Sequence, residues 1–387
     1  MGARNGPAPI ADEMVIDLTH PRGSVALVHD YLTQRGGAER VVLELLAAFP
    51  DSPLHTSFFH ADGTFPEVDS SRIRTLPIDK VAPLRRHHRV AFPLLAPSFA
   101  RYSVDADVVL CSSSGWAHGV RTDGRKIVYC HAPARWLYQK DEYLKRKAQR
   151  IELAALSTLG RPLRSWDRKA AGSAHRYLAN STLIRDLIWS IYGIDAEVVP
   201  PPVTVDASGE QQPMPGFEPG GFHLVVSRLL AYKNVDNVIK AFSALRTPLV
   251  IVGEGPEEAR LRSIAGANAF MVGRVTDAEL RWLYANCAAN VSASKEDFGL
   301  TTIEAAAFGK PTIALRYGGF LDTIVEGDTG LLFDEPQPGH IREAVRTAAS
   351  MSWSDQAIAK HSATFSPAGF RNRMRQIVAE ELRSAPH

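Results

Sequence analysis

Short apolar runs alternate with helical patterns along most of this chain, and this alternation limits the folds open to it. The runs expected to be strands in the first half are 25–29, 54–59, 107–111, 126–130, 176–179 and 197–200. Those in the second half are 223–227, 248–252, 270–272, 289–293, 312–315 and 331–333. The expected helices of the second half are 234–245, 256–264, 277–285, 300–308, 319–326 and 341–350. Strands that alternate with helices favour parallel, doubly wound α/β sheets.

Residues 201–221 interrupt the alternation with Pro, Gly and polar residues, a composition typical of a linker. We therefore expect two Rossmann-like domains, at 23–200 and 222–365, as the 387-residue length allows. A disordered leader (1–22) and a final helix (366–387), able to pack back on the first domain, complete the predicted organisation. Ligands of open α/β sheets bind beyond the carboxyl ends of the strands, which predicts a site in a cleft between the two sheets.

Composition excludes several classes of function. A formal charge of +2 does not indicate nucleic-acid binding. The three cysteines are too few and too scattered for a disulfide framework or a zinc knuckle, and they are expected to be buried thiols. No apolar stretch approaches the ~20 residues that span a bilayer, and no signal peptide is recognisable. We expect a cytoplasmic protein, soluble or peripheral on the inner face of the membrane.

The stretch 290–309 carries the clearest chemistry. It predicts a buried strand, a sharp loop and a helix that begins at Gly299 or Leu300. A helix N-terminus offers unpaired N–H groups and a positive dipole end, which suit a phosphate. Glu296 and Glu304 would repel that phosphate, so they should contact neutral hydroxyls of a sugar and a ribose. The pattern thus fits a nucleotide sugar, although an ordinary βα unit with two solvated glutamates has the same spacing.

Two cations lie just after the first strand of the second half. Arg228 can grip phosphate oxygens in a fork and Lys233 can supply a mobile charge, so together they could neutralise a leaving diphosphate. They could equally be surface cations. Gly36 and Gly37 follow the chain's first strand and would let the backbone approach a ligand, or simply form a tight turn.

His131 directly follows the strand at 126–130, where it could donate a hydrogen bond to a sugar or a phosphate, or serve a structural role. Asp105 and Asp107 form a D-x-D pattern, but they precede a strand, so we do not expect a metal there. The segments 80–99 and 143–169 mix basic and apolar residues. They could rest on an anionic membrane or form a solvated basic face.

Five motifs together resemble the retaining GT-B glycosyltransferases of family GT4, a group that includes bacterial mannosyltransferases. They are Gly36–Arg40, Tyr129–Pro133, Val226–Lys233, Gly253–Pro256 and Glu296–Ala305, which occur in the family's order within residues 25–335. The resemblance implies the GT-B fold, a nucleotide-sugar co-substrate, and no metal or other cofactor.

The resemblance also implies a role for each site residue. Arg228 and Lys233 would hold the donor diphosphate, and Glu304 would bind the ribose hydroxyls. Glu296 would contact the transferred sugar, near His131. The remaining donor contacts would come from Gly37, Arg274, Val275, Phe298, Gly299, Leu300 and Thr301.

The implied reaction is hexosyl transfer with retention of configuration to a saccharide or a lipid-linked saccharide, in polysaccharide or glycolipid synthesis. GDP-mannose is the favoured donor, since residues 129–136 look mannosyltransferase-like, while UDP-sugars and GDP-fucose remain open. A sugar-nucleotide epimerase of the same fold would consume donor without an acceptor. A non-catalytic sugar-nucleotide-binding subunit would bind donor without turnover.

Overall fold

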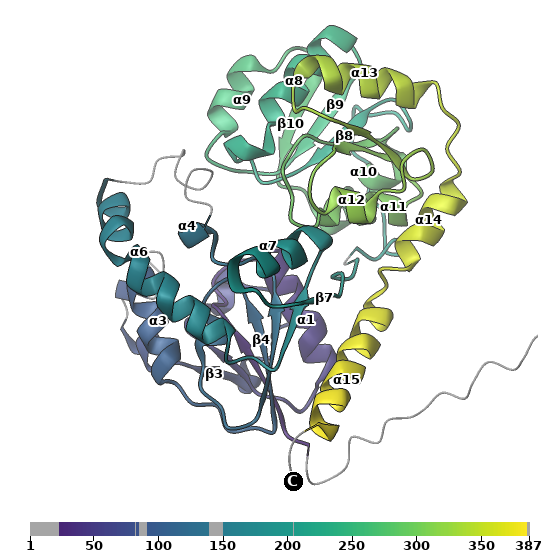
Figure 1. Cartoon of the computed structure of the whole chain (residues 1–387). Helices are drawn as coiled ribbons and strands as arrows, with labels where there is room; N and C mark the ends of the chain where they lie inside the picture. The colour runs from purple at the N-terminus through teal and green to yellow at the C-terminus, as the bar shows by residue number, and fades with distance from the viewer. Residues whose placement is uncertain (1–22, 82, 85–90, 139–149, 204, 385–387) are drawn as a thin grey trace, which may run out of the picture.

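The computed structural model describes residues 23–81, 83–84, 91–138, 150–203 and 205–384. The leader expected over 1–22 lies outside these residues, as do the basic positions 85–89 and 145–147 of the two basic-apolar segments. The described chain forms two α/β domains, each built on a parallel sheet with helices on both faces (Figure 1).

The first sheet has seven strands in the order β3-β2-β1-β4-β5-β6-β7, and each neighbouring pair is parallel. Their bounds are β1 Val25–His29, β2 Leu54–Thr56, β3 Ile73–Thr75, β4 Val108–Ser113, β5 Arg125–Cys130, β6 Arg176–Ala179 and β7 Glu197–Val198. The strand order reverses at β1, whose neighbours are β2 and β4. This reversal is the switch point at which doubly wound sheets bind ligands.

The second sheet has six parallel strands in the order β10-β9-β8-β11-β12-β13. Their bounds are β8 His223–Val226, β9 Leu249–Val252, β10 Ala269–Gly273, β11 Asn290–Ser292, β12 Thr312–Leu315 and β13 Gly330–Phe333. Here the order reverses at β8, between β9 and β11. The predicted pair of doubly wound α/β domains is confirmed.

Helices cover both faces of each sheet. Those of the first domain are α1 Gly37–Ala48, α3 Phe92–Arg101, α4 Arg135–Tyr138, α6 Arg150–Ala171 and α7 Thr182–Tyr192. Those that follow are α8 Val235–Leu245, α9 Glu258–Ile264, α10 Asp277–Asn286, α11 Leu300–Ala307, α12 Phe320–Thr323, α13 Pro338–Ala349, α14 Asp355–Ala363 and α15 Pro367–Arg383. No described helix is long and apolar enough to cross a membrane.

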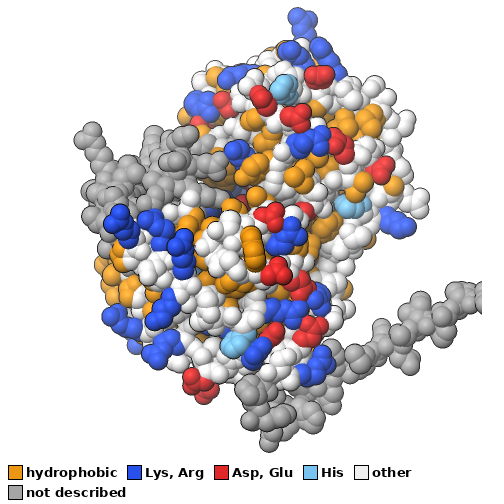
Figure 2. Space-filling view, in the orientation of Figure 1, with side chains coloured by type: hydrophobic (Ala, Val, Ile, Leu, Met, Phe, Trp, Pro, Cys, Tyr) orange, Lys and Arg blue, Asp and Glu red, His pale blue; other side chains and the backbone are white. Residues whose placement is uncertain are grey.

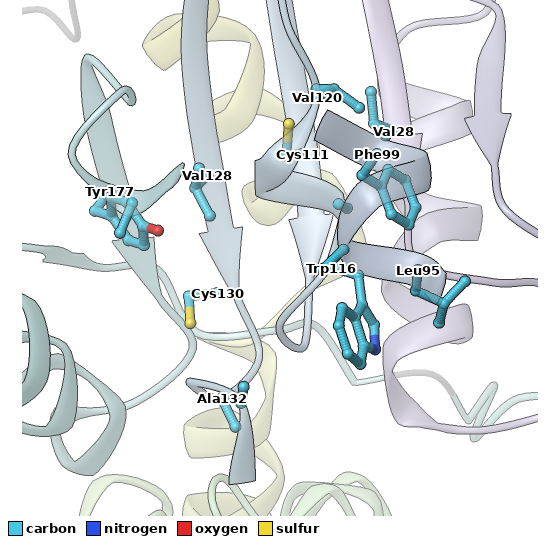
Figure 3. Packing of buried hydrophobic residues seen from close by; sticks show 14 of the residues in the cluster. Val28, Leu95, Phe99, Cys111, Trp116, Val120, Val128, Cys130, Ala132 and Tyr177 are labelled. Carbon is cyan, nitrogen blue, oxygen red and sulfur yellow. The ribbon is translucent and has the colours of Figure 1, made fainter. Parts of the chain in front are cut away.

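Side chains that alternate along β4 divide the first domain's core between the two faces of its sheet. Cys111 packs on the face covered by α3 and α7, together with Val28, Phe99 and Val128 (Figure 3). Leu110 packs on the opposite face with α1 and α15. Burial raises the pKa of the Cys111 thiol to about 12. Cys111, Cys130 and Cys287 are all free and buried, as predicted.

The final helix, α15, belongs to the core of the first domain although it follows the second in sequence (Figure 1). Its Met374, Ile377 and Val378 are fully buried against α1 and the first sheet. Ion pairs also hold α15 against the first domain. Arg125 Nη2 of β5 lies 2.6 Å from Glu381 Oε2 of α15. The chain therefore passes between the domains twice, and the two passages are hydrogen-bonded where the Val203 N–H donates to the Phe365 carbonyl at 2.8 Å.

Candidate active site

Loops from the carboxyl ends of both sheets meet at the boundary between the domains. Gly37 begins α1 directly opposite the start of α11, where a Cβ on Gly37 would lie 3.2 Å from Leu300 Cδ1. Arg135 at the start of α4 forms an ion pair with Asp297. The Thr182 N–H at the start of α7 donates to Asp322 at 2.7 Å. The residues that follow β1, β5 and β6 thus contact those that follow β11 and β12.

The loop before α11 has the geometry that the sequence predicts. Gly299 is the N-cap of α11 with a left-handed φ of +83°, which a side chain would strain. A Cβ there would also lie only 2.6 Å from the ring of Phe320. Phe298 is buried against Phe365, and no side chain caps the helix, so Leu300 and Thr301 open it with N–H groups suited to an anion.

Lys233 and Glu296 form an ion pair with each other. The resemblance gives them separate ligands, the diphosphate for Lys233 and the transferred sugar for Glu296. Their side chains are 13% and 24% exposed, so the pair lies just below the surface. Ser294 Oγ donates to Glu296 Oε1 at 2.6 Å, which fixes the carboxylate from a second side. Each group of the pair therefore neutralises the charge of the other.

Glu304 lies on α11, the helix that begins at Leu300. It accepts a hydrogen bond of 2.9 Å from the phenolic oxygen of Tyr284 on α10. Burial, followed by the nearby Glu304 carboxylate, raises the pKa of Tyr284 well above its ordinary value, so this hydroxyl remains a donor. Tyr284 thus orients the Glu304 carboxylate.

The turn after β8 places Arg228 at the surface of this edge. The Leu229 N–H donates to the Glu254 carbonyl at 2.9 Å, which ties this turn to the Gly253–Gly255 loop. Gly253 has a φ of +128°, and a Cβ there would overlap the Ser227 carbonyl. The glycine motif therefore allows the two loops to pack closely.

Arg274 and Val275, two of the expected donor contacts, lie further along the same edge. Arg274 is 76% exposed and meets Glu254 at 3.2 Å. Val275 packs among the apolar side chains beneath α10.

His131 closes the first domain's side of the boundary at the end of β5. Burial, followed by the nearby His29, lowers its pKa to about 3, so the imidazole is neutral at physiological pH. Its Nε2 lies 2.7 Å from Ser112 Oγ. Asn180 donates to its backbone carbonyl at 3.0 Å. His131 is therefore a fixed, uncharged group, and it is more enclosed than its sequence position suggested.

Several residues of this region carry no clear signal in the sequence. Asp30 directly follows β1, and its buried carboxylate accepts N–H groups of Ser114, Trp116 and Ala117 at 2.6–3.1 Å. The one sequence feature that marks Asp30 is its position directly after a predicted strand. Arg135, Asp297 and Asp322 make contacts between the two domains. No local sequence pattern predicts partners so far apart in the chain.

The Asp107 of the rejected D-x-D pattern has a structural role. Its carboxylate accepts hydrogen bonds from the N–H and Oγ of Ser24 at 2.9 and 2.8 Å, which anchors the start of β1. Within the described ranges, no cluster of three or more His, Cys, Asp and Glu side chains could hold a metal ion.

Comparison with protein families assigns both halves of the molecule. Residues 35–207 match the model described as "Glycosyltransferase Family 4", and residues 212–364 match "Glycosyl transferases group 1". Together the two matches cover every described strand except β1 and every residue predicted for the site. The chain belongs to the GT-B glycosyltransferases of family GT4.

Named relatives of this GT4 protein include sugar transferases of different specificity. D-rhamnosyltransferase WbpZ of Pseudomonas aeruginosa is 31% identical over 200 residues, which cover 49% of this chain and 51% of that protein. A GDP-mannose-dependent alpha-mannosyltransferase of Corynebacterium glutamicum is 30% identical over 215 residues, 52% of this chain and 49% of the relative. The chain thus spans about half the length of these relatives.

Among solved structures, Anabaena HepE in complex with UDP-glucose superimposes with a TM-score of 0.65 at 17% identity. The match covers 93% of this chain and 100% of HepE. At that identity the likeness establishes the shared fold.

Proposed function

We propose that this GT4 protein transfers a hexosyl group from a nucleotide sugar to a saccharide or lipid-linked saccharide, with retention of configuration. The observation that carries the proposal is the grouping of Lys233, Glu296 and the uncapped start of α11 at the domain boundary. These groups supply one mobile cation, one carboxylate and one set of N–H donors, and a nucleoside diphosphate sugar needs all three.

Charge separation is the main task in such a transfer. As the bond from the anomeric carbon to the phosphate oxygen breaks, negative charge develops on the departing diphosphate. Arg228, Lys233 and the N-terminus of α11 would stabilise that charge, which is electrostatic catalysis. These positive groups can act without a metal ion, so we expect none to be required.

Retention is proposed to follow from displacement on the same face of the sugar. The bond to the acceptor oxygen forms as the bond to phosphate breaks, and the acceptor's proton passes to a leaving phosphate oxygen. Glu296 would hold the sugar in position during this step. It lies beside Lys233, which would contact the diphosphate attached to that sugar. A glycosylated side chain trapped by mass spectrometry would overturn this scheme in favour of a covalent intermediate.

GDP-mannose is the donor we favour, since a relative bears that name and residues 129–136 have the mannosyltransferase-like pattern. A UDP-sugar is the main alternative, because HepE binds UDP-glucose. A thermal-shift screen of GDP, UDP and their sugars separates the two. A ligand at 100 times its Kd stabilises a protein by about 2.7 kcal/mol, so the correct nucleotide should raise Tm clearly. Stabilisation by neither nucleotide would overturn the proposed donor class.

The acceptor is proposed to approach the first domain at a membrane surface. A hollow of about 360 Å³ lies between α3 and α6, lined by apolar side chains that include Pro97, Leu163 and Trp166. Arg161, Arg168 and Lys169 of α6 are exposed, and Figure 2 shows basic side chains gathered over this helix. Apolar surface beside basic residues suits an anionic leaflet or a lipid-linked acceptor.

Vesicle co-sedimentation tests the membrane contact. We expect binding to vesicles that contain phosphatidylserine and none to pure phosphatidylcholine. Replacement of Arg161 and Arg168 by Glu should abolish it, while Arg346→Glu on the second domain should not. Equal binding by both variants would assign the membrane contact to another surface or exclude it.

A further inference from the structure

Three polar side chains form a hydrogen-bonded chain across the first sheet and end at His131. They are His29 of β1, Ser112 of β4 and His131 at the end of β5. The parallel register brings them together, because His29 lies opposite Ser112 and Ser112 lies opposite Tyr129. All three side chains are buried. A buried polar group normally needs a partner, so each proton in this chain has a definite place.

The direction of the hydrogen bonds follows from the groups involved. His29 Nδ1 lies 3.1 Å from the Ser112 carbonyl oxygen, which can only accept. Nδ1 of His29 therefore carries a proton, which it shares with Ser112 Oγ at 3.0 Å. Ser112 Oγ has two hydrogen-bond partners within the described residues, His29 Nδ1 and His131 Nε2. Because His29 Nδ1 donates and a buried hydroxyl proton needs an acceptor, the Ser112 proton points to His131 Nε2 at 2.7 Å. His131 Nε2 is thus an acceptor and carries no proton.

A neutral imidazole carries its proton on one nitrogen only. His131 is neutral because burial lowers its pKa to about 3. With Nε2 occupied as an acceptor, the proton must be on Nδ1, and Nδ1 is the nitrogen left for a ligand.

We infer that Ser112 and His29 are positioning residues that hold His131 as its Nδ1–H tautomer, so that the ring offers a donor to the sugar nucleotide. The identity of that ligand rests on the proposed function, whereas the tautomer does not. The opposite tautomer would present a lone pair, which a phosphate oxygen would repel. Ser112 thereby acts on the transfer through the ring of His131 without touching substrate.

The tautomer can be measured directly in the wild-type protein. NMR of protein labelled with 15N-histidine distinguishes protonated from unprotonated ring nitrogens, and His131→Gln identifies the signals. We expect Nδ1 protonated and Nε2 unprotonated between pH 6 and 8. A protonated Nε2, or signals averaged between the two tautomers, would overturn the inference.

Activity of paired variants adds a second readout. Ser112→Ala should lower kcat about tenfold, as expected for the loss of one buried hydrogen bond that orients a reacting group, with the donor KM little changed. Ser113→Ala is the matched control. Ser113 follows Ser112 and is also buried, but its hydroxyl contacts His118 and Asp30 instead of His131. This variant should leave kcat and the His131 tautomer unchanged.

Equal kcat in the two serine variants would contradict the positioning role. If the wild-type protein transfers no sugar from any donor, the proposed function fails, and the NMR experiment still decides the tautomer.

Discussion

The two sheet edges that meet at the candidate site are built from different kinds of side chain. The edge of the second domain carries Lys233 and Glu296 as an ion pair just below the surface, and Arg228 is exposed on the turn after β8. The edge of the first domain carries the buried chain from His29 to His131, which ends in a neutral imidazole. An ion pair that can exchange partners marks the second edge, and a buried hydrogen-bonded chain that ends in an uncharged imidazole marks the first.

This difference suggests a division of labour. Mobile charges suit a diphosphate that must be bound, stabilised and released, because ionic contacts can exchange with Glu296. Fixed donors suit a sugar whose hydroxyls must be held in one orientation during the transfer. We therefore expect changes on the second edge to alter both binding and chemistry, and changes on the first edge to alter chemistry with little effect on donor affinity.

The largest effect is expected at Glu296. Glu296→Gln should lower kcat about 100-fold or more, the scale of losing a group that acts in the transition state. Donor Kd should hold or improve, because Lys233 is released from its ion pair. Steady-state kinetics and isothermal titration calorimetry separate the two quantities, and exposed Glu335→Gln is the control. An equal loss of turnover and affinity would contradict the assignment of Glu296 to the transfer step.

The second prediction compares one buried histidine from each sheet, His131 and His223. Burial lowers their folded-state pKa values to about 3 and about 4, so both are neutral in the folded protein. The unfolded state binds more protons below pH ~6.5, so the free energy of unfolding falls as pH decreases from there. Each of the two histidines should lower the free energy of unfolding by about 2 kcal/mol between pH 7 and pH 5.

Urea denaturation at the two pH values tests this. His223→Leu should lose about 2 kcal/mol less than wild type on acidification, and exposed His340→Gln should match wild type. An unchanged pH dependence in His223→Leu would show that this histidine is already charged in the folded state.

A smaller effect is expected at Glu304. Glu304→Gln should weaken donor binding about tenfold, because a charged acceptor to two ribose hydroxyls becomes a neutral amide. Tyr284→Phe should weaken it less, about threefold, since only the orienting hydroxyl is lost. Calorimetric titration with the nucleoside diphosphate measures both. A larger effect for Tyr284→Phe than for Glu304→Gln would reverse the assigned roles.

The smallest effect is expected at the bridge between the edges. The Arg135 and Asp297 side chains are 38% and 21% exposed, so solvent screens their ion pair. A double-mutant cycle with Arg135→Ala and Asp297→Ala should give a coupling of about 0.2–1 kcal/mol in donor affinity. High salt should remove it. A coupling that resists salt would mean that the bridge is buried when donor binds.

Much of the fold could be predicted because apolar runs mark buried parallel strands whatever their partners. β1 and β12 begin and end at the predicted residues. Elements without such a run were missed or misplaced. β3 is three residues long and part-exposed, and α14 has no strong apolar stripe. The predicted helix at 319–326 shortens to α12, because Thr329 Oγ1 accepts the Val325 N–H at 2.9 Å and turns the chain.

The site was predictable in part for a similar reason. Lys233, Glu296 and Glu304 lie in local patterns, which sequence retains. The pairing of Lys233 with Glu296 joins residues 63 apart, and the bond from His29 to Ser112 joins residues 83 apart. Only the register of the sheet and the packing of its loops create these contacts, so neither could be read from a local pattern.

The return of α15 to the first domain has a consequence for biogenesis. A ribosome releases the first sheet long before it releases Phe370 and Met374, which fill one face of that sheet. During synthesis the second domain can therefore complete its core first, although domains usually fold in the order in which they emerge. The nascent first domain would expose part of its apolar surface until α15 emerges.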